Sequence, residues 1–175
     1  SVYSLTGKKT ILIGCDMRKP KIFSDFGLAN DQGLSTYLSS QEKDWSKVVK
    51  PSGFANLDII LSGPTPPNPA ELLVNERFNL LIRELKSKYD VIILDTPPVG
   101  LVSETLDLLS MVDVNLFVFR QNYSMRVFVD SINQFKASRN LKNIYAVFNG
   151  VDTRNVTYGY GYSYGYGYYE EESKS

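Results

Sequence analysis

The sequence has no histidine among its 175 residues and only one cysteine, Cys15. Without histidine, a Ser-His-Asp triad and a histidine proton relay are excluded, and so is nearly every kind of zinc site. A single cysteine forms no internal disulfide, which fits a reducing compartment. Cys15 lies within an apolar run, so we interpret it as a small buried side chain and not as a reactive thiol.

The sequence also lacks an excess of charge and a long apolar run. Its 19 basic side chains balance 19 acidic ones, so no overall field favours nucleic acid or an anionic membrane surface. No apolar run approaches the roughly 20 residues of a spanning helix, and we expect no signal peptide. The length suits one domain with a sizeable core. Residues 2–7 resemble the end of a helix capped by Gly7, so we expect a fragment of a longer protein.

Two short apolar runs, rich in β-branched residues, are each followed by an aspartate. Residues 10–14 lead to Asp16, and residues 91–94 lead to Asp95. Such runs are typical of buried parallel strands, and ligands of open α/β sheets bind beyond the carboxyl ends of the strands. Two aspartates suit a hydrated magnesium ion, which takes few carboxylates. The pair predicts a nucleotide site; the alternative is two core strands followed by solvated turns.

The remaining pattern predicts an α/β fold with a mainly parallel sheet and helices on both faces, because strands alternate with helices. The helix expected from residue 69 to 89 begins with Asn68 as N-cap, Pro69 in the first position and Glu71 completing a capping box. We expect further strands at residues 57–61, 114–119 and 144–148, and further helices at 33–38, 103–111 and 125–138. The expected apolar faces are Phe78, Leu81, Ile82 and Leu85 on the first helix and Val129, Ile132 and Phe135 on the last.

The composition changes at residue 153, which divides the chain into a folded domain (residues 1–152) and a tail (153–175). Seven tyrosines follow, mostly alternating with glycine, and then three glutamates. The alternating glycines give little to pack, so we predict a disordered tail. Its length spans about 25 Å as a flexible chain, enough to reach a neighbouring subunit. The tyrosines are Tyr158, Tyr160, Tyr162, Tyr164, Tyr166, Tyr168 and Tyr169.

Four features together resemble the bacterial tyrosine kinases that accompany capsule and exopolysaccharide export. They are Cys-Asp-Met-Arg-Lys-Pro at residues 15–20, the proline-rich segment 63–73, the Asp-Thr-Pro-Pro turn at 95–98 and the tyrosine-rich end. In that family the Asp16 segment is similar to the Walker A-prime motif, and the strand ending at Asp95 is similar to Walker B. The resemblance implies a P-loop-NTPase-like fold related to the Min and Par ATPases, with ATP and Mg²⁺ as cofactors.

The chain departs from that family in two places. The phosphate-gripping P-loop is missing: the Gly-Lys-Lys-Thr of residues 7–10 does not supply it, since Val2 and Lys9 stand where glycine and serine or threonine are needed. The resemblance places the first strand and its loop about twenty residues before Thr10 in a parent chain, so we expect this fragment to be catalytically feeble. Gly14 stands where the family usually has an aspartate.

The resemblance also implies roles for four residues. Asp95 would belong to the magnesium shell, and Asp16 would accept the tyrosine proton or order the water of the metal. Arg18 would hold phosphate or the acceptor, with a solvated turn arginine as the alternative. Asn149 would contact adenine, with a simple Asn-Gly turn as the alternative.

The implied function is an ATP-dependent autokinase that phosphorylates the seven tail tyrosines in trans and so regulates polysaccharide polymerisation and export. The implied partners are other copies of the chain in a ring-like homo-oligomer, a membrane-anchored polysaccharide co-polymerase and a tyrosine phosphatase. The implied location is the cytoplasmic face of the bacterial inner membrane. No nucleic acid is expected as a partner. Two alternatives stay open. One is a Min/Par-type partitioning ATPase; the other is a non-catalytic module whose tail another kinase phosphorylates.

Overall fold

The computed structural model describes residues 2–98, 108–138, 141 and 143–152. The tail expected over residues 153–175 lies outside the described residues, and so does most of the helix expected over 103–111. Among the residues that are described, no helix has both the length and the apolar character needed to cross a membrane.

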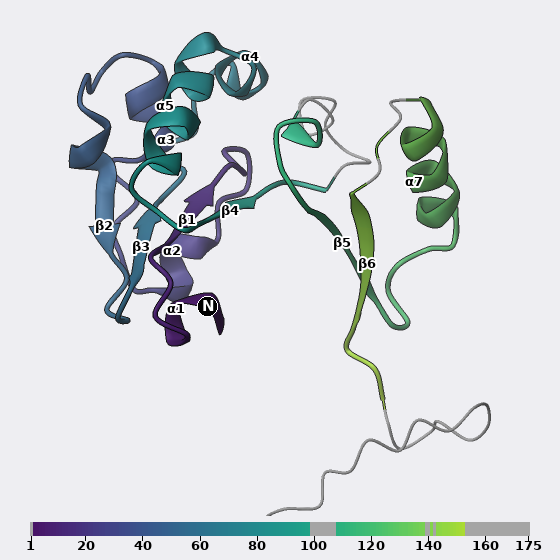
Figure 1. Cartoon of the computed structure of the whole chain (residues 1–175). Coiled ribbons are helices and arrows are strands. Elements are labelled where there is room, and N and C mark those ends of the chain that lie inside the picture. The colour runs from purple at the N-terminus through teal and green to yellow at the C-terminus, as the bar shows by residue number, and fades with distance from the viewer. Residues whose placement is uncertain (1, 99–107, 139–140, 142, 153–175) are drawn as a thin grey trace, which may run out of the picture.

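The larger sheet has four strands in the order β2-β3-β1-β4 (Figure 1). β1 (Thr10–Gly14) pairs in parallel with β3 (Leu57–Ile60) on one side and with β4 (Val91–Asp95) on the other. These three strands confirm the prediction made from their apolar runs. The edge strand β2 (Val49–Pro51) is antiparallel to β3 and was not predicted, because its three residues are too few to show a period.

The helix predicted from residue 69 to 89 is wrong as a single element, because the chain forms α4 (Pro69–Leu73) and then α5 (Glu76–Lys86). Asn75 restarts the helix: its side chain accepts a hydrogen bond from the backbone N–H of Arg77 at 2.8 Å. The expected capping box does not form either. The Asn68 side chain makes no capping bond and instead donates to Glu71 Oε2 at 2.6 Å.

The predicted apolar face of α5 is confirmed, since all four of its residues are buried. They join a core made with β1, β3 and α3 (Leu34–Leu38), the helix predicted at residues 33–38. The chain also forms the short helices α1 (Val2–Leu5) and α2 (Ile22–Asp25) and the 3-10 helix η1 (Trp45–Val48). Gly7, with φ of +82°, follows α1 as the predicted cap. The sequence pattern did not predict α2. The largest fully buried core side chains include Phe78, Ile11, Ile13, Met17, Leu34, Ile60, Leu81 and Leu85.

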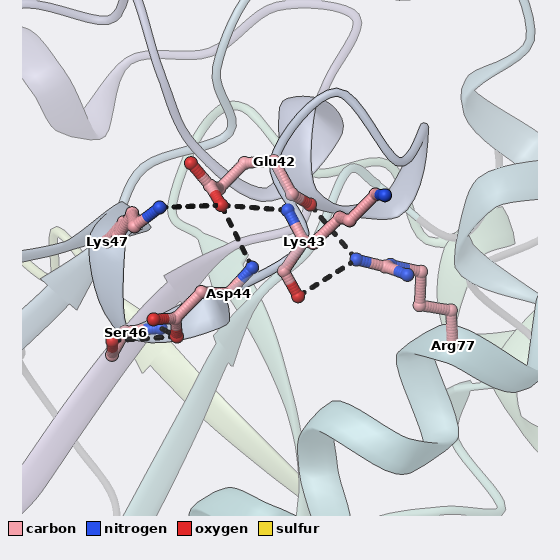
Figure 2. A network of polar contacts seen from close by, with 6 residues as sticks. All are labelled: Glu42, Lys43, Asp44, Ser46, Lys47 and Arg77. Atoms are coloured by element: carbon pink, nitrogen blue, oxygen red, sulfur yellow. Dashed lines mark hydrogen bonds and ion pairs between the residues drawn. The ribbon is translucent and has the colours of Figure 1, made fainter.

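Arg77 ties α5 to the segment between α3 and β2 (Figure 2). Its Nη2 donates to the backbone carbonyls of Glu42 (3.0 Å) and Lys43 (3.3 Å). Its guanidinium carbon lies 4.2 Å from the centre of the Tyr37 ring, and Nε donates to the Tyr37 carbonyl at 2.8 Å. The Glu42 carboxylate accepts the backbone N–H groups of Lys43 and Asp44. One arginine thus holds a loop that has little regular structure of its own.

A second, two-stranded sheet pairs β5 (Asn115–Arg120) with β6 (Ile144–Asn149) in parallel, and α7 (Val127–Ser138) connects them. The three elements confirm the sequence prediction, and the α/β class is confirmed with them. On α7, Ile132 and Phe135 are half-buried as expected, but Val129 is exposed. No backbone ladder joins β4 to β5 among the described residues, so the parallel strands fall into two groups (Figure 1).

Candidate functional site

Asp16 and Asp95 lie at the same edge of the larger sheet, beyond the carboxyl ends of two neighbouring strands. Gly14 is the register partner of Asp95, and the backbone N–H of Cys15 donates to the Asp95 carbonyl at 2.7 Å. Asp16 is therefore two residues past the last registered pair of β1 and β4, next to Asp95. The structure brings together the two aspartates that the sequence singled out.

The negative charges of neighbouring aspartates at this edge make ionisation of Asp95 less favourable. The pKa of the Asp95 carboxyl is raised, first by partial burial and then by the negative charges of Asp16 and Asp25. Asp95 keeps an exposed side chain, so water screens part of this effect. Asp25, at the end of α2, was not predicted to matter here, since no apolar run leads to it.

The turn after β1 fixes the Asp16 side chain. Its Oδ1 accepts the backbone N–H groups of Arg18 (3.1 Å) and Lys19 (2.9 Å), which is the geometry of an Asx turn. The Arg18 side chain is exposed at the same turn. A carboxylate held by two N–H groups keeps its orientation, so the turn presents Asp16 to whatever binds beside Asp95.

The segment that follows β3 packs closely against Gly14. A Cβ atom at Gly14 would lie 3.0 Å from the backbone nitrogen of Ser62 and 3.1 Å from its Oγ. An aspartate there needs Ser62 to move. The site in this chain therefore lacks the third carboxylate that the family resemblance led us to expect.

A clamp made by Asn30 and Ser35 holds the loop that follows β3. Asn30 Nδ2 donates to the Gly63 carbonyl (2.8 Å), and the Gly63 N–H donates to Asn30 Oδ1 (2.9 Å). Ser35 Oγ donates to the Pro64 carbonyl at 2.7 Å. Gly63 has φ of +78°, a left-handed conformation that favours glycine. Sequence reasoning missed this clamp, because its partners lie about thirty residues apart and share no local pattern.

Asn149 is not brought to the two aspartates by any described strand pairing. It ends β6 in the smaller sheet, and its Oδ1 accepts the N–H of Gly150, whose φ is +66°. This bond fits the Asn-Gly turn that we held as the alternative, and the adenine contact stays a prediction. The seven tail tyrosines lie outside the described residues.

The donor set fits one hydrated divalent cation. Within the described ranges, no group of three or more His, Cys, Asp and Glu side chains is arranged to hold a metal. Mg²⁺ needs only one or two carboxylates and takes its other ligands from water and phosphate. Like charges near Asp95 also favour a bound cation, because a cation would compensate them.

The chain resembles several known kinases. It is 33% identical over 149 residues to the tyrosine-protein kinase YwqD of Bacillus subtilis, covering 85% of this chain and 62% of YwqD. It matches the kinase domain of the Escherichia coli tyrosine kinase ETK with a TM-score of 0.80 and 30% identity, over 93% of this chain and 64% of that domain. The VpsO kinase domain matches with a TM-score of 0.73 and 30% identity, over 81% of this chain and 70% of that domain. The chain belongs to the bacterial tyrosine kinase family. No protein-family profile matches it.

The family resemblance expected from the sequence is thereby confirmed, together with its P-loop-NTPase-like fold. MinD of Aquifex aeolicus shares the fold, with a TM-score of 0.66 at 21% identity. The MinD of Pyrococcus horikoshii is complexed with Mg-ADP. Kinases and MinD-type ATPases imply dependence on a nucleotide and a metal ion in general. The chain spans 62% of YwqD and 22% of the Escherichia coli kinase Etk, less than two thirds of either.

Proposed function

We propose that this chain carries the Walker A-prime and Walker B part of an ATP- and Mg²⁺-dependent protein-tyrosine autokinase. The observation that carries the proposal is the placement of Asp16 and Asp95 beyond adjacent parallel strands, in a chain of the bacterial tyrosine kinase family. In an open α/β sheet, this edge is where ligands bind.

Phosphoryl transfer asks the protein mainly to align the reactants and to offset negative charge. Bound Mg²⁺ would neutralise charge on the phosphates. Asp95 would hold that ion, through water. Asp16, oriented by its turn, would accept the proton of the tyrosine hydroxyl. The tyrosine oxygen would then bond to the γ-phosphorus, while the bond between that phosphorus and the oxygen that leaves with ADP breaks. A free phenol has a pKa near 10, so a nearby carboxylate or metal ion must help to remove this proton at neutral pH.

The proposed acceptors are the seven tyrosines of the tail, modified in trans within a ring-like homo-oligomer. Arg18 would bind a phosphate or the incoming tail with its planar guanidinium. Each phosphate adds about −1.5 to −2 charges at neutral pH, so several would repel neighbouring subunits. A tyrosine phosphatase would reverse this.

The proposed setting is the one that the family resemblance implies, and one relative is named as a putative tyrosine-protein kinase in a cps region of Klebsiella pneumoniae. The chain would work beside a membrane-anchored polysaccharide co-polymerase, at the cytoplasmic face of the inner membrane, and regulate polysaccharide polymerisation and export. Asn149 as an adenine contact remains part of this proposal, and it requires β6 to face the nucleotide.

The test uses a protein that contains this chain together with an upstream glycine-rich Lys-Thr loop. Asp95→Asn should abolish Mg²⁺-dependent phosphorylation of the tail, measured by phosphosite mapping after incubation with ATP. Asp130→Asn, which removes an exposed carboxylate from α7, is the matched control and should keep normal labelling. Unchanged labelling of Asp95→Asn would show instead that an outside kinase modifies the tail.

A further inference from the structure

We propose that a cavity at the amino end of the larger sheet binds an aryl phosphate, an aromatic ring that carries a phosphate group. The cavity lies at the opposite end of the strands from Asp16 and Asp95, because its walls include residues that precede β1, β3 and β4. The site stands on the geometry of the described residues. A phosphotyrosine of the tail is one source of this chemistry, and that source rests on the proposed function.

Three segments that are distant in the sequence build the cavity, which has a volume of about 890 Å³. They are Lys9 just before β1, the turn between β2 and β3, and the turn between α5 and β4 (Figure 1). Sites for small molecules commonly have volumes of about 300 to 1,000 Å³. The cavity therefore has room for an aryl phosphate, either free or within a peptide.

Two basic side chains give the cavity a net positive charge. Lys9 and Lys88 line it together with a single carboxylate, that of Asp58. Neither lysine forms an ion pair with a carboxylate of the residues that the structure describes. A phosphate group carries about −1.5 to −2 charges at neutral pH, so it suits two ammonium groups better than a carboxylate ligand does.

The carboxylate of the cavity already has a partner. Asp58 Oδ2 accepts a hydrogen bond from the Tyr89 hydroxyl at 2.8 Å. Burial, and then the bond to the Asp58 carboxylate, raise the pKa of Tyr89 to about 12. The hydroxyl therefore stays protonated at neutral pH and continues to donate. This bond offsets part of the negative charge that would oppose an anion.

The turn between β2 and β3 adds backbone donors to the wall of the cavity. Across the described ranges, the backbone N–H groups of Gly53, Ala55 and Asn56 make no hydrogen bond. Gly53 and Asn56 are left-handed, with φ of +84° and +57°. Turns with left-handed residues form concave surfaces of N–H groups that bind anions.

The aromatic part of the ligand is indicated by Phe54. This side chain lines the cavity and is 64% exposed, although it is large and apolar. Phe26 holds it by an edge-to-face contact, with the ring centres 6.3 Å apart and the planes at 84°. A ring that is already held loses little freedom when a second ring packs against it, and aromatic pairs gain more than the area they bury.

Lys88 connects the cavity to a spectroscopic signal. Its ammonium lies 4.5 Å from the centre of the ring of Trp45, the only tryptophan of the chain. A phosphate in the cavity would draw this cation away from the indole. Ligand binding should therefore change the fluorescence of Trp45.

Synthetic ligands test the site on the 175-residue chain in buffer without Mg²⁺ or ATP. Phenyl phosphate should change the fluorescence of Trp45 in a saturable way, and phenol should not. Inorganic phosphate should bind at least about threefold more weakly than phenyl phosphate, because it lacks the ring. Calorimetric titration measures the same affinities.

A second pair of ligands distinguishes the two sources of the aryl phosphate. They are a peptide of residues 164–172 phosphorylated on Tyr168 and the same peptide without phosphate. Tighter binding of the phosphopeptide than of phenyl phosphate would identify the tail as the source. Weaker binding would identify a free aryl phosphate as the ligand.

Variants separate the phosphate from the ring. Lys9→Gln should weaken the binding of phenyl phosphate by about threefold or more, whereas Lys136→Gln, at an exposed position of α7, is the matched control. Phe54→Leu should weaken phenyl phosphate by about threefold or more and leave inorganic phosphate unchanged. Because these positions are exposed, circular dichroism should show the same fold in each variant.

Three results would overturn the proposal. The first is the lack of saturable binding of phenyl phosphate. The second is equal weakening by Lys9→Gln and Lys136→Gln, since any positive charge would then act alike. The third is unchanged affinity of Phe54→Leu for phenyl phosphate. Asp95→Asn alters only the opposite end of the sheet and should bind phenyl phosphate normally, so this proposal and the proposed function fail separately.

Discussion

Asp95 is the residue whose ionisation opposes the folded state. Its carboxyl pKa is raised, so the folded chain binds this proton more tightly than the unfolded chain does. The contribution of Asp95 to stability is therefore fully present below the unfolded pKa near 3.9 and is lost as pH rises through the folded pKa. At neutral pH, Asp95→Asn should raise the free energy of unfolding by about 0.5 kcal/mol, a small value because the side chain is exposed.

The measurement is urea unfolding of both proteins from about pH 3.5 to 7. The stability difference should grow with pH and level off once Asp95 is ionised. Mg²⁺ should shrink the difference if the ion binds beside Asp95. A difference that stays constant over this range would contradict the raised pKa.

The Asn30 clamp gives a second prediction at this scale. Asn30→Ala removes two hydrogen bonds to Gly63 and should cost about 1 to 3 kcal/mol, because the freed backbone groups are partly buried. Thermal unfolding measures this cost. Asn133→Ala, at an exposed position of α7, is the control and should be near neutral. A near-neutral Asn30→Ala would mean that water replaces both bonds.

At the scale of elements, α4 and α5 each begin after an asparagine, and the sequence does not show which of the two asparagines caps its helix. Asn75 caps α5 through its bond to the Arg77 N–H, whereas Asn68 makes no capping bond. Asn75→Ala should therefore lower the free energy of unfolding by about 1 kcal/mol. Asn68→Ala should change it by less than about 0.5 kcal/mol. Denaturant titration of both variants tests the ranking, and equal losses would contradict it.

These elements also show what local pattern predicts. The strands β1, β3 and β4 were predictable because a buried parallel strand is apolar without interruption. The restart at Asn75 was not, since no glycine or proline stands between Ala70 and Lys86 to mark a break in the helix. The pairing of Asp16 with Asp95 followed from the strand ends alone. The contribution of Asp25 and the Asn30 clamp did not, because both arise from chain segments that meet only in the folded protein.

At the scale of the whole molecule, the core belongs almost entirely to one part of the described chain. The main buried cluster is drawn from residues between Ile11 and Leu108, and β5, β6 and α7 contribute none of its members. Those three elements instead expose large apolar side chains, including Leu116, Val118 and Phe148. Burial of apolar surface is the main source of stability, so the two parts differ in how firmly they are held.

This asymmetry predicts that β5, β6 and α7 open before the rest. Their amides should exchange at least about tenfold faster than those of β1 and β3 under native conditions, because local opening costs less than global unfolding. Exchange followed by mass spectrometry, peptide by peptide, measures the order. Leu85→Ala, which cuts the core under α5, should speed exchange in β1 and β3 while leaving β5 and β6 unchanged. Equal rates in the two parts would mean that the smaller sheet is held as firmly as the core, which would contradict this prediction.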